Sequence, residues 1–190
     1  MTEAAISVSP LSPATLGDFL RFFDGPAFSD NPKWSFCYCQ CFYEDHDRIV
    51  WRDRTAEQNR ALACERAATG AMQGYLACVD GRPVGWCGAA PRRLFVALND
   101  EPTPDEEQVG AIMCFLVAPE YRGTGVARKL LAAACDGLRA QGVTIAEANP
   151  RPEASSAADN HFGPLRLYLS EGFQIHRTDT DGSVYVRKAL

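Results

Sequence analysis

The chain has 190 residues, of which 46% are hydrophobic and 23% charged, and its formal net charge is −5. This composition is typical of a soluble globular protein, and we expect residues 1–190 to form a single domain. An acidic chain is not expected to bind nucleic acid, and no apolar run approaches the ~20 residues of a membrane span. The N-terminus lacks the features of a secretory signal, which favours a cytoplasmic location.

The N-terminal part is predicted to hold a strand, a helix and a long loop. Residues 6–8 have strand character, and Ser12 as an N-cap predicts a helix over residues 13–24. Residues 26–54 are rich in aromatic, Asp and Cys residues and read as a loop. Loops of this length are often functional.

The next elements are a helix and a hairpin. Thr55 and Gln58 have the spacing of a capping box, which predicts the start of a helix that ends before residue 70. Two apolar runs, residues 73–79 and 83–90, flank an Asp-Gly pair and predict a β-hairpin.

The C-terminal half alternates strands and helices. Residues 109–117 are almost all apolar, as in a buried central strand. The spacing of apolar residues then predicts an amphipathic helix over residues 126–141. Shorter elements are expected at residues 143–148 (strand), 164–171 (helix), 173–176 (strand) and 183–188 (strand). The order indicates a mixed α/β protein.

A glycine-rich turn lies between the central strand and the strongest helix. It consists of Arg122, Gly123, Thr124, Gly125, Val126 and Ala127. Exposed backbone N–H groups at a helix N-terminus form a ready site for phosphate. The turn lacks the Gly-Lys-Ser/Thr of a P-loop, and Arg128 stands where a dinucleotide fingerprint has its third glycine.

The turn closely resembles the R-G-x-G-[IV]-[GA] pyrophosphate loop of the GNAT acetyltransferases. Residues 117–121 (VAPEY) resemble the strand end that precedes this loop in the family, and residues 167–173 (LYLSEGF) resemble its later L-Y-x-x-x-G-F pattern. The resemblance covers residues 5–188. Matches to a poorly characterised subgroup are Pro-Val-Gly-Trp at 83–86, Pro-Arg at 91–92, Cys-Phe at 114–115 and Glu-Ala-x-Pro at 147–150.

The resemblance implies a GNAT fold: a mixed, mostly antiparallel sheet of about six or seven strands flanked by about four helices. It also implies that acetyl-CoA is the co-substrate and that the acetyl group passes directly to an amine. The pyrophosphate is expected on the turn, with Arg128 adding charge. The pantetheine arm is expected beside Phe115, Leu116 and Val117, where a backbone N–H stabilises the oxyanion.

By the same resemblance, Tyr168 is the expected general acid that protonates the CoA thiolate. The general base is open, because the central strand has no carboxylate. Glu147 is our first candidate, with His46 and His161 as others. A water chain, or an amine that arrives neutral, needs no base. Cys114 as an acylated nucleophile is a further alternative.

The loop over residues 34–43 is expected to build part of the acceptor pocket, from Trp34, Cys37, Tyr38 and Cys39, with Cys114 beside it. In an extended conformation the C-x-C-x-C pattern would put its three thiols on one face. Its spacing is tighter than that of structural zinc sites, and we expect no metal. The other five of the eight cysteines lie in helix and strand patterns, as expected of reduced thiols in a core.

The favoured function is an N-acetyltransferase for a primary amine of a small molecule. Acetylation of a protein or peptide amine, and a CoA-binding sensor without catalysis, are the alternatives. The identity of the acceptor stays open, and a homodimer is compatible with the family.

Overall fold

The structure, a computed structural model, describes residues 5–98, 104–152 and 160–190. These residues form a seven-stranded sheet with the order β1-β2-β3-β4-β5-β7-β6. β4 and β5 pair in parallel and all other neighbours are antiparallel. The strands are β1 (Ile6–Pro10), β2 (Gly74–Val79), β3 (Arg82–Pro91), β4 (Val109–Val117), β5 (Ile145–Ala148), β6 (Gln174–Thr178) and β7 (Val184–Ala189).

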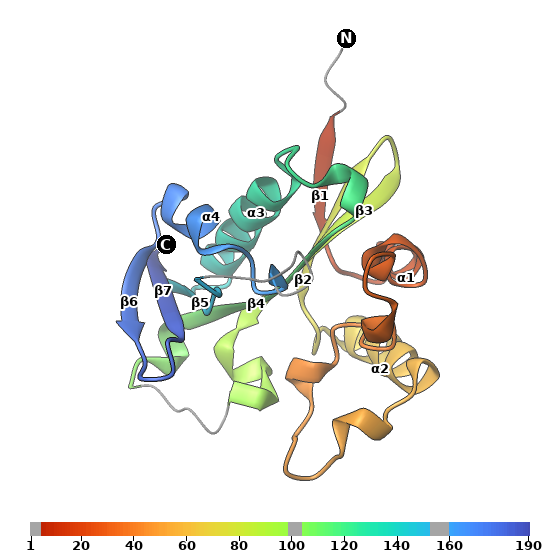
Figure 1. Ribbon diagram of the computed structural model, residues 1–190, viewed down its shortest axis with the longest axis horizontal. Helices are drawn as coiled ribbons and strands as arrows, with labels where there is room; N and C mark the ends of the chain where they lie inside the picture. The colour runs from red at the N-terminus through yellow and green to blue at the C-terminus, as the bar shows by residue number, and fades with distance from the viewer. Residues whose placement is uncertain (1–4, 99–103, 153–159) are drawn as a thin grey trace.

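Four α-helices cover the two faces of this sheet in the described part of the chain. They are α1 (Leu16–Phe23), α2 (Ala56–Thr69), α3 (Val126–Ala140) and α4 (Leu165–Ser170). α1 and α2 lie on one side, and α3 and α4 on the other (Figure 1). Short 3₁₀ helices fill the connections: η1 (Pro26–Phe28), η2 (Pro32–Trp34), η3 (Cys41–Tyr43), η4 (Trp51–Asp53), η5 (Arg92–Leu94), η6 (Val96–Leu98), η7 (Glu106–Gln108) and η8 (Pro119–Tyr121). The expected fold class is confirmed.

Local sequence signals account for several element boundaries. The Thr55 side chain accepts the Gln58 N–H, and the Gln58 side chain accepts the Thr55 N–H, so the capping box that begins α2 is confirmed. Such caps stabilise a helix by about 1 kcal/mol. Asp80 and Gly81 have φ values of 49° and 73°, as the tight turn of the β2–β3 hairpin requires.

The predicted start of the first helix was wrong by one turn. α1 begins at Leu16 with Thr15 before it, and Ser12 lies in the turn that leads into the helix. The Thr15 hydroxyl accepts the Ser12 N–H and donates to the Pro10 carbonyl. These bonds tie the turn to the end of β1, which delays the helix.

The long loop is held by a buried ion cluster. Glu44 is 6% exposed and pairs with Arg54 and Arg66. Tyr38 and Cys39 have positive φ values of 44° and 58°, so the segment reverses direction there. The expectation for an extended C-x-C-x-C segment therefore does not apply to this structure.

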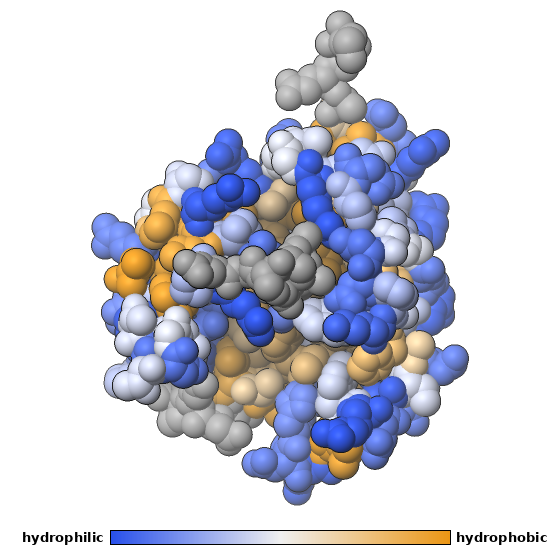
Figure 2. Space-filling view, in the orientation of Figure 1, coloured by the Kyte–Doolittle hydropathy of each residue, from blue (hydrophilic) through white to orange (hydrophobic). Residues whose placement is uncertain are grey.

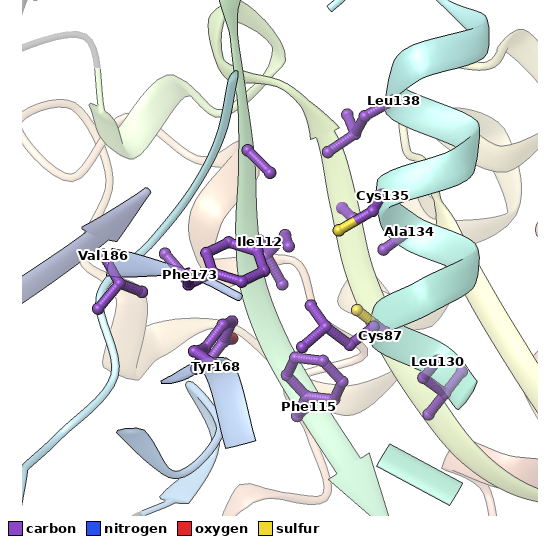
Figure 3. Packing of buried hydrophobic residues seen from close by; sticks show 14 of the residues in the cluster. Cys87, Ile112, Phe115, Leu130, Ala134, Cys135, Leu138, Tyr168, Phe173 and Val186 are labelled. Atoms are coloured by element: carbon purple, nitrogen blue, oxygen red, sulfur yellow. The ribbon is translucent and has the colours of Figure 1, made fainter. Parts of the chain in front are cut away.

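Two core clusters lie on opposite faces of the sheet. The α3–α4 side contains Ile112, Leu130, Cys135, Tyr168 and Val186, which Figure 3 shows packed between β4, α3 and the C-terminal strands. The α1–α2 side is richer in aromatic rings, with Phe19, Phe22, Phe23, Trp86 and Phe95 fully buried or nearly so.

The central strands diverge halfway along β4. β4 pairs with β5 from Val109 to Ile112 and with β3 from Gly110 to Val117. A register shift leaves Met113 as an extra residue opposite β3, between the pairs Ile112↔Ala89 and Cys114↔Gly88. Bulges of this kind re-aim a strand. Beyond Ile112, the β5-facing side of β4 is therefore available to form the wall of a cleft.

Within the described ranges, no helix is long and apolar enough to cross a membrane. The same ranges contain no group of His, Cys, Asp and Glu side chains arranged to hold a metal ion.

Candidate active site

A cleft of about 660 Å³ begins where β4 leaves β5. Its volume lies within the range of ordinary ligand sites. Three parts of the chain form its walls: the loop after α1, the end of β4 with the turn into α3, and the segment that leads into α4. Figure 2 shows apolar surface in the middle of this face of the molecule, bordered by hydrophilic residues.

The glycine-rich turn forms one end of the cleft. Gly123 and Gly125 have φ values of 77° and 90°, which favour glycine, and α3 begins at Val126. A Cβ added at either glycine would touch nothing, so the backbone here is open to a ligand. The N–H groups of the first turn of α3 have no partner within the helix and can bind an anion.

Most of the cofactor-site residues expected from the sequence line this cleft. They are Phe115, Leu116, Val117, Arg122, Gly123, Gly125, Val126, Ala127 and Arg128. Thr124 is not among the lining residues, because its hydroxyl turns back to donate to the Tyr121 carbonyl at 2.7 Å. Its contribution is to hold the turn in shape.

The two arginines of the turn are already engaged by carboxylates. Arg122 makes two hydrogen bonds to Asp30, at 2.6 and 3.2 Å, and its Nε donates to the Val117 carbonyl. This contact links the loop after α1 to the turn, and the guanidinium holds the pKa of Asp30 below its usual value. Arg128 pairs with Glu171 at 2.7 Å.

The inner end of the cleft is closed by the segment before α4. The Phe115 N–H donates to the His161 carbonyl at 2.6 Å. The Tyr168 hydroxyl donates to the next carbonyl, that of Phe162, at 2.7 Å. The Phe115 N–H is the expected oxyanion donor, and the Tyr168 hydroxyl is the expected general acid. Each donates one hydrogen bond to this short segment, and the two acceptors are neighbouring carbonyls.

Tyr168 is fully buried beside Phe115 and Phe173 (Figure 3). Burial raises the pKa of its hydroxyl well above the usual value, so the group stays protonated at neutral pH. Tyr168 does not line the cleft itself. Gly163, with a φ of 81°, lies between its ring and the cleft, and a Cβ there would come within 3.0 Å of the Tyr168 ring.

Glu147 does not line the main cleft and lies in a buried ion cluster. One carboxylate oxygen accepts from Arg187 Nε at 2.6 Å and the other from Arg92 at 3.4 Å. Arg187 also pairs with Asp105. Glu147 borders a second cavity of about 160 Å³, with Phe162 also in its wall.

The two histidine candidates lie in different places. His161 lines the main cleft, with its ring edge-on to Trp34 at a centroid distance of 4.9 Å. His46 does not line it, and its Nε2 lies 2.8 Å from the Cys41 carbonyl.

Of the expected acceptor residues, Trp34 lines the cleft. Tyr38, Cys39 and Cys114 are buried in the core on the α1–α2 side, and Cys37 packs against it. Burial raises the pKa of Cys37 to about 12. A hydrogen bond with Cys39, together with burial, raises the pKa of Cys114 well above its usual value.

Sequence reasoning missed one whole wall of the cleft. One face of the segment around α4 contributes Gly163, Arg166, Leu167 and Ser170. The spacing i, i+3, i+4, i+7 is that of a single helix face. This spacing is the sequence signal for the wall, and Tyr168 points to the other side of the helix.

Comparison with known proteins agrees with this geometry. The model of the acetyltransferase (GNAT) family matches residues 30–161. No curated protein sequence matches the chain significantly.

Several solved structures have the same fold. The PaiA N-acetyltransferase of Thermoplasma acidophilum, in complex with coenzyme A, is 14% identical with a TM-score of 0.59, over 98% of this chain and 99% of that one. The yncA protein of Salmonella typhimurium, with acetyl-CoA, is 18% identical with a TM-score of 0.58, over 98% and 94%. The ribosomal-protein-alanine N-acetyltransferase of Brucella melitensis is 19% identical with a TM-score of 0.57, over 97% and 99%.

The chain therefore belongs to the acetyltransferase (GNAT) family. It is an acetyl-CoA-dependent acyltransferase that acts on amine acceptors, with acetyl-CoA as its co-substrate.

Proposed function

We propose that residues 1–190 form one N-acetyltransferase domain that moves the acetyl group of acetyl-CoA directly to a primary amine of a small molecule. The observation that carries the proposal is the cleft along β4, which joins a helix N-terminus at one end to Phe115 and Gly163 at the other, with the buried Tyr168 directly behind Gly163. A diphosphate fits the open N–H groups of the turn, and the pantetheine arm fits the strand edge.

For transfer, the amine nitrogen forms a bond to the acetyl carbon while the carbon–sulfur bond breaks. The Phe115 N–H stabilises the negative charge on the acetyl oxygen. The leaving sulfur takes the Tyr168 proton, which this tyrosine holds at neutral pH. The proton lost by the amine goes to a base or to water, and Tyr168 regains a proton from solvent.

These roles require the segment before α4 to move. The His161 carbonyl accepts the Phe115 N–H, and the Phe162 carbonyl accepts the Tyr168 hydroxyl. The acetyl oxygen can take the Phe115 N–H only after the His161 carbonyl leaves it. We therefore propose that acetyl-CoA binding displaces this segment.

We propose His161 as the general base, in preference to Glu147. His161 lines the cleft, and imidazole is the most frequent general base in enzymes. Glu147 is held by Arg187 and Arg92 in a buried cluster, which favours a structural role. Direct transfer is favoured over acylation of Cys114, because its raised pKa leaves almost no thiolate at neutral pH.

The second cavity supports a small acceptor. Its volume of about 160 Å³ is close to that of cavities which hold a single small ring. Phe162 is part of the wall of the second cavity, and the residues on either side of it in the sequence, His161 and Gly163, line the main cleft. The two cavities therefore lie on either side of Phe162. The side group of a small amine fits such a space better than a folded protein does.

The test is thioester loss from acetyl-CoA with a panel of small amines and a peptide with N-terminal alanine. Turnover with small amines supports the proposal, and turnover with the peptide alone indicates a protein acetyltransferase. Tight CoA binding with no turnover would indicate a sensor. His161→Gln is expected to lower kcat by about 10²-fold or more, whereas the matched variant His46→Gln is expected to leave it unchanged.

A further inference from the structure

Arg166 has no carboxylate partner within the described ranges, although it lines the cleft. Arg122 and Arg128 line the same cleft, but each is paired, with Asp30 and Glu171 respectively. Arg166 is an exposed residue of α4, and in the described part of the chain it makes no hydrogen bond or ion pair.

The position of Arg166 follows from the period of α4. Arg166 and Ser170 are four residues apart and lie on the helix face that lines the cleft. Tyr168 is two residues from each and points into the core on the other side. Arg166 is thus directed to the cleft by the same helix that buries Tyr168.

Coenzyme A carries two separate anionic groups, the diphosphate and the 3′-phosphate of its ribose. The N–H groups of the glycine-rich turn suit one of them, the diphosphate. The paired arginines of the turn offer little additional charge, because each already neutralises a carboxylate. A second phosphate in the cleft therefore calls for a further cation, and the wall formed by α4 supplies Arg166.

We propose that Arg166 binds the 3′-phosphate of coenzyme A and makes the enzyme select acetyl-CoA over its 3′-dephospho form. The inference rests on the proposed placement of the diphosphate on the turn. Guanidinium–phosphate hydrogen bonds are charge-assisted, so the preference is expected to be about tenfold.

The experiment measures by calorimetry the binding of CoA and of 3′-dephospho-CoA, at one fixed salt concentration. Wild-type protein is expected to bind CoA about tenfold more tightly. Arg166→Gln is expected to weaken the binding of CoA to the affinity of 3′-dephospho-CoA. The affinity for 3′-dephospho-CoA itself is expected to stay unchanged. Arg166→Lys, which keeps the charge, should retain part of the preference. A thermal melt of each variant checks its folding.

Two arginines serve as matched controls. Arg128 lines the same cleft. Arg128→Gln should change the affinities for CoA and for 3′-dephospho-CoA by the same factor, so that their ratio is kept. Arg139→Gln, at the far end of α3 and paired with Asp136, should change neither.

The outcomes separate the inference from the proposed function. Equal wild-type affinity for the two nucleotides, or an unchanged ratio in Arg166→Gln, overturns the role of Arg166. If Arg166→Gln weakens the binding of both nucleotides by the same factor, this arginine is assigned to the diphosphate, which also overturns the inference. Failure of the wild-type protein to bind either nucleotide contradicts the proposed function as well.

Discussion

Replacement of Tyr168 by Phe removes one oxygen atom from a fully buried position. That hydroxyl donates to the Phe162 carbonyl at 2.7 Å, and the ring packs against Phe115 and Phe173. The phenylalanine ring keeps the packing, but the Phe162 carbonyl loses its partner. A buried acceptor without a partner costs about 1–3 kcal/mol. For a chain of this size, each kcal/mol lowers Tm by about 2–4 °C.

The catalytic effect of this change is expected to be larger. Loss of a general acid lowers the rate by about 10²–10⁴-fold. CoA affinity should not fall, because the diphosphate is proposed to bind the glycine-rich turn and because the variant has already lost a hydrogen bond that holds the segment proposed to move on acetyl-CoA binding. The raised pKa of Tyr168 also predicts that the wild-type kcat does not lose this acid as pH rises toward ~10, the ordinary tyrosine value.

The assay combines thioester loss at saturating acetyl-CoA, calorimetry with CoA and a thermal melt. A Tyr168→Phe variant that melts lower, binds CoA at least as tightly as wild type and has lost at least 10²-fold in kcat agrees with the mechanism. A variant that melts lower but keeps kcat within about threefold of wild type would refute the catalytic role and leave Tyr168 as a core residue.

Three further predictions concern stability and thiol chemistry. Glu147→Gln should destabilise the fold by about 3–5 kcal/mol, because Arg187 and Arg92 lose their shared buried carboxylate. Its kcat, measured at saturating amine and well below its Tm, should stay near wild type, and a large loss of kcat would restore Glu147 as the base. Gly74→Ala should cost about 1–3 kcal/mol in denaturant unfolding, since its Cβ would meet the Trp86 ring at 2.3 Å. Gly17→Ala, in α1 with open space around it, is the control and should be neutral or slightly stabilising. A thiol reagent at pH 8 should leave the buried cysteines unmodified until the protein unfolds; rapid labelling of these cysteines in native protein would contradict their burial. These buried cysteines are Cys39, Cys87, Cys114 and Cys135.

Features that depend on neighbouring residues could be predicted from the sequence. The capping box of α2 and the Asp80-Gly81 turn involve contacts within three residues, so the local sequence is sufficient to specify them. The glycine-rich turn is local in the same sense, because its shape depends on positive φ values at Gly123 and Gly125. The prediction that this turn binds a phosphate followed from these residues together with the resemblance to the family.

Contacts between distant segments could not be predicted in this way. Glu147 meets Arg187, forty residues later, only because β5 and β7 are neighbours in the sheet. The Phe115 N–H meets the His161 carbonyl because β5 separates from β4 after Ile112 and leaves that side of the strand unpaired.

The sequence by itself determined the order of the elements, the glycine-rich turn and the family. Only the tertiary structure decided which of its polar groups are free to act. Arg122, Arg128 and Arg166 are the same residue type in the sequence, yet within the residues that the structure describes Arg122 and Arg128 each pair with a carboxylate and Arg166 pairs with none. The physical reason is that the charge a side chain can offer a ligand depends on the carboxylates that folding brings beside it.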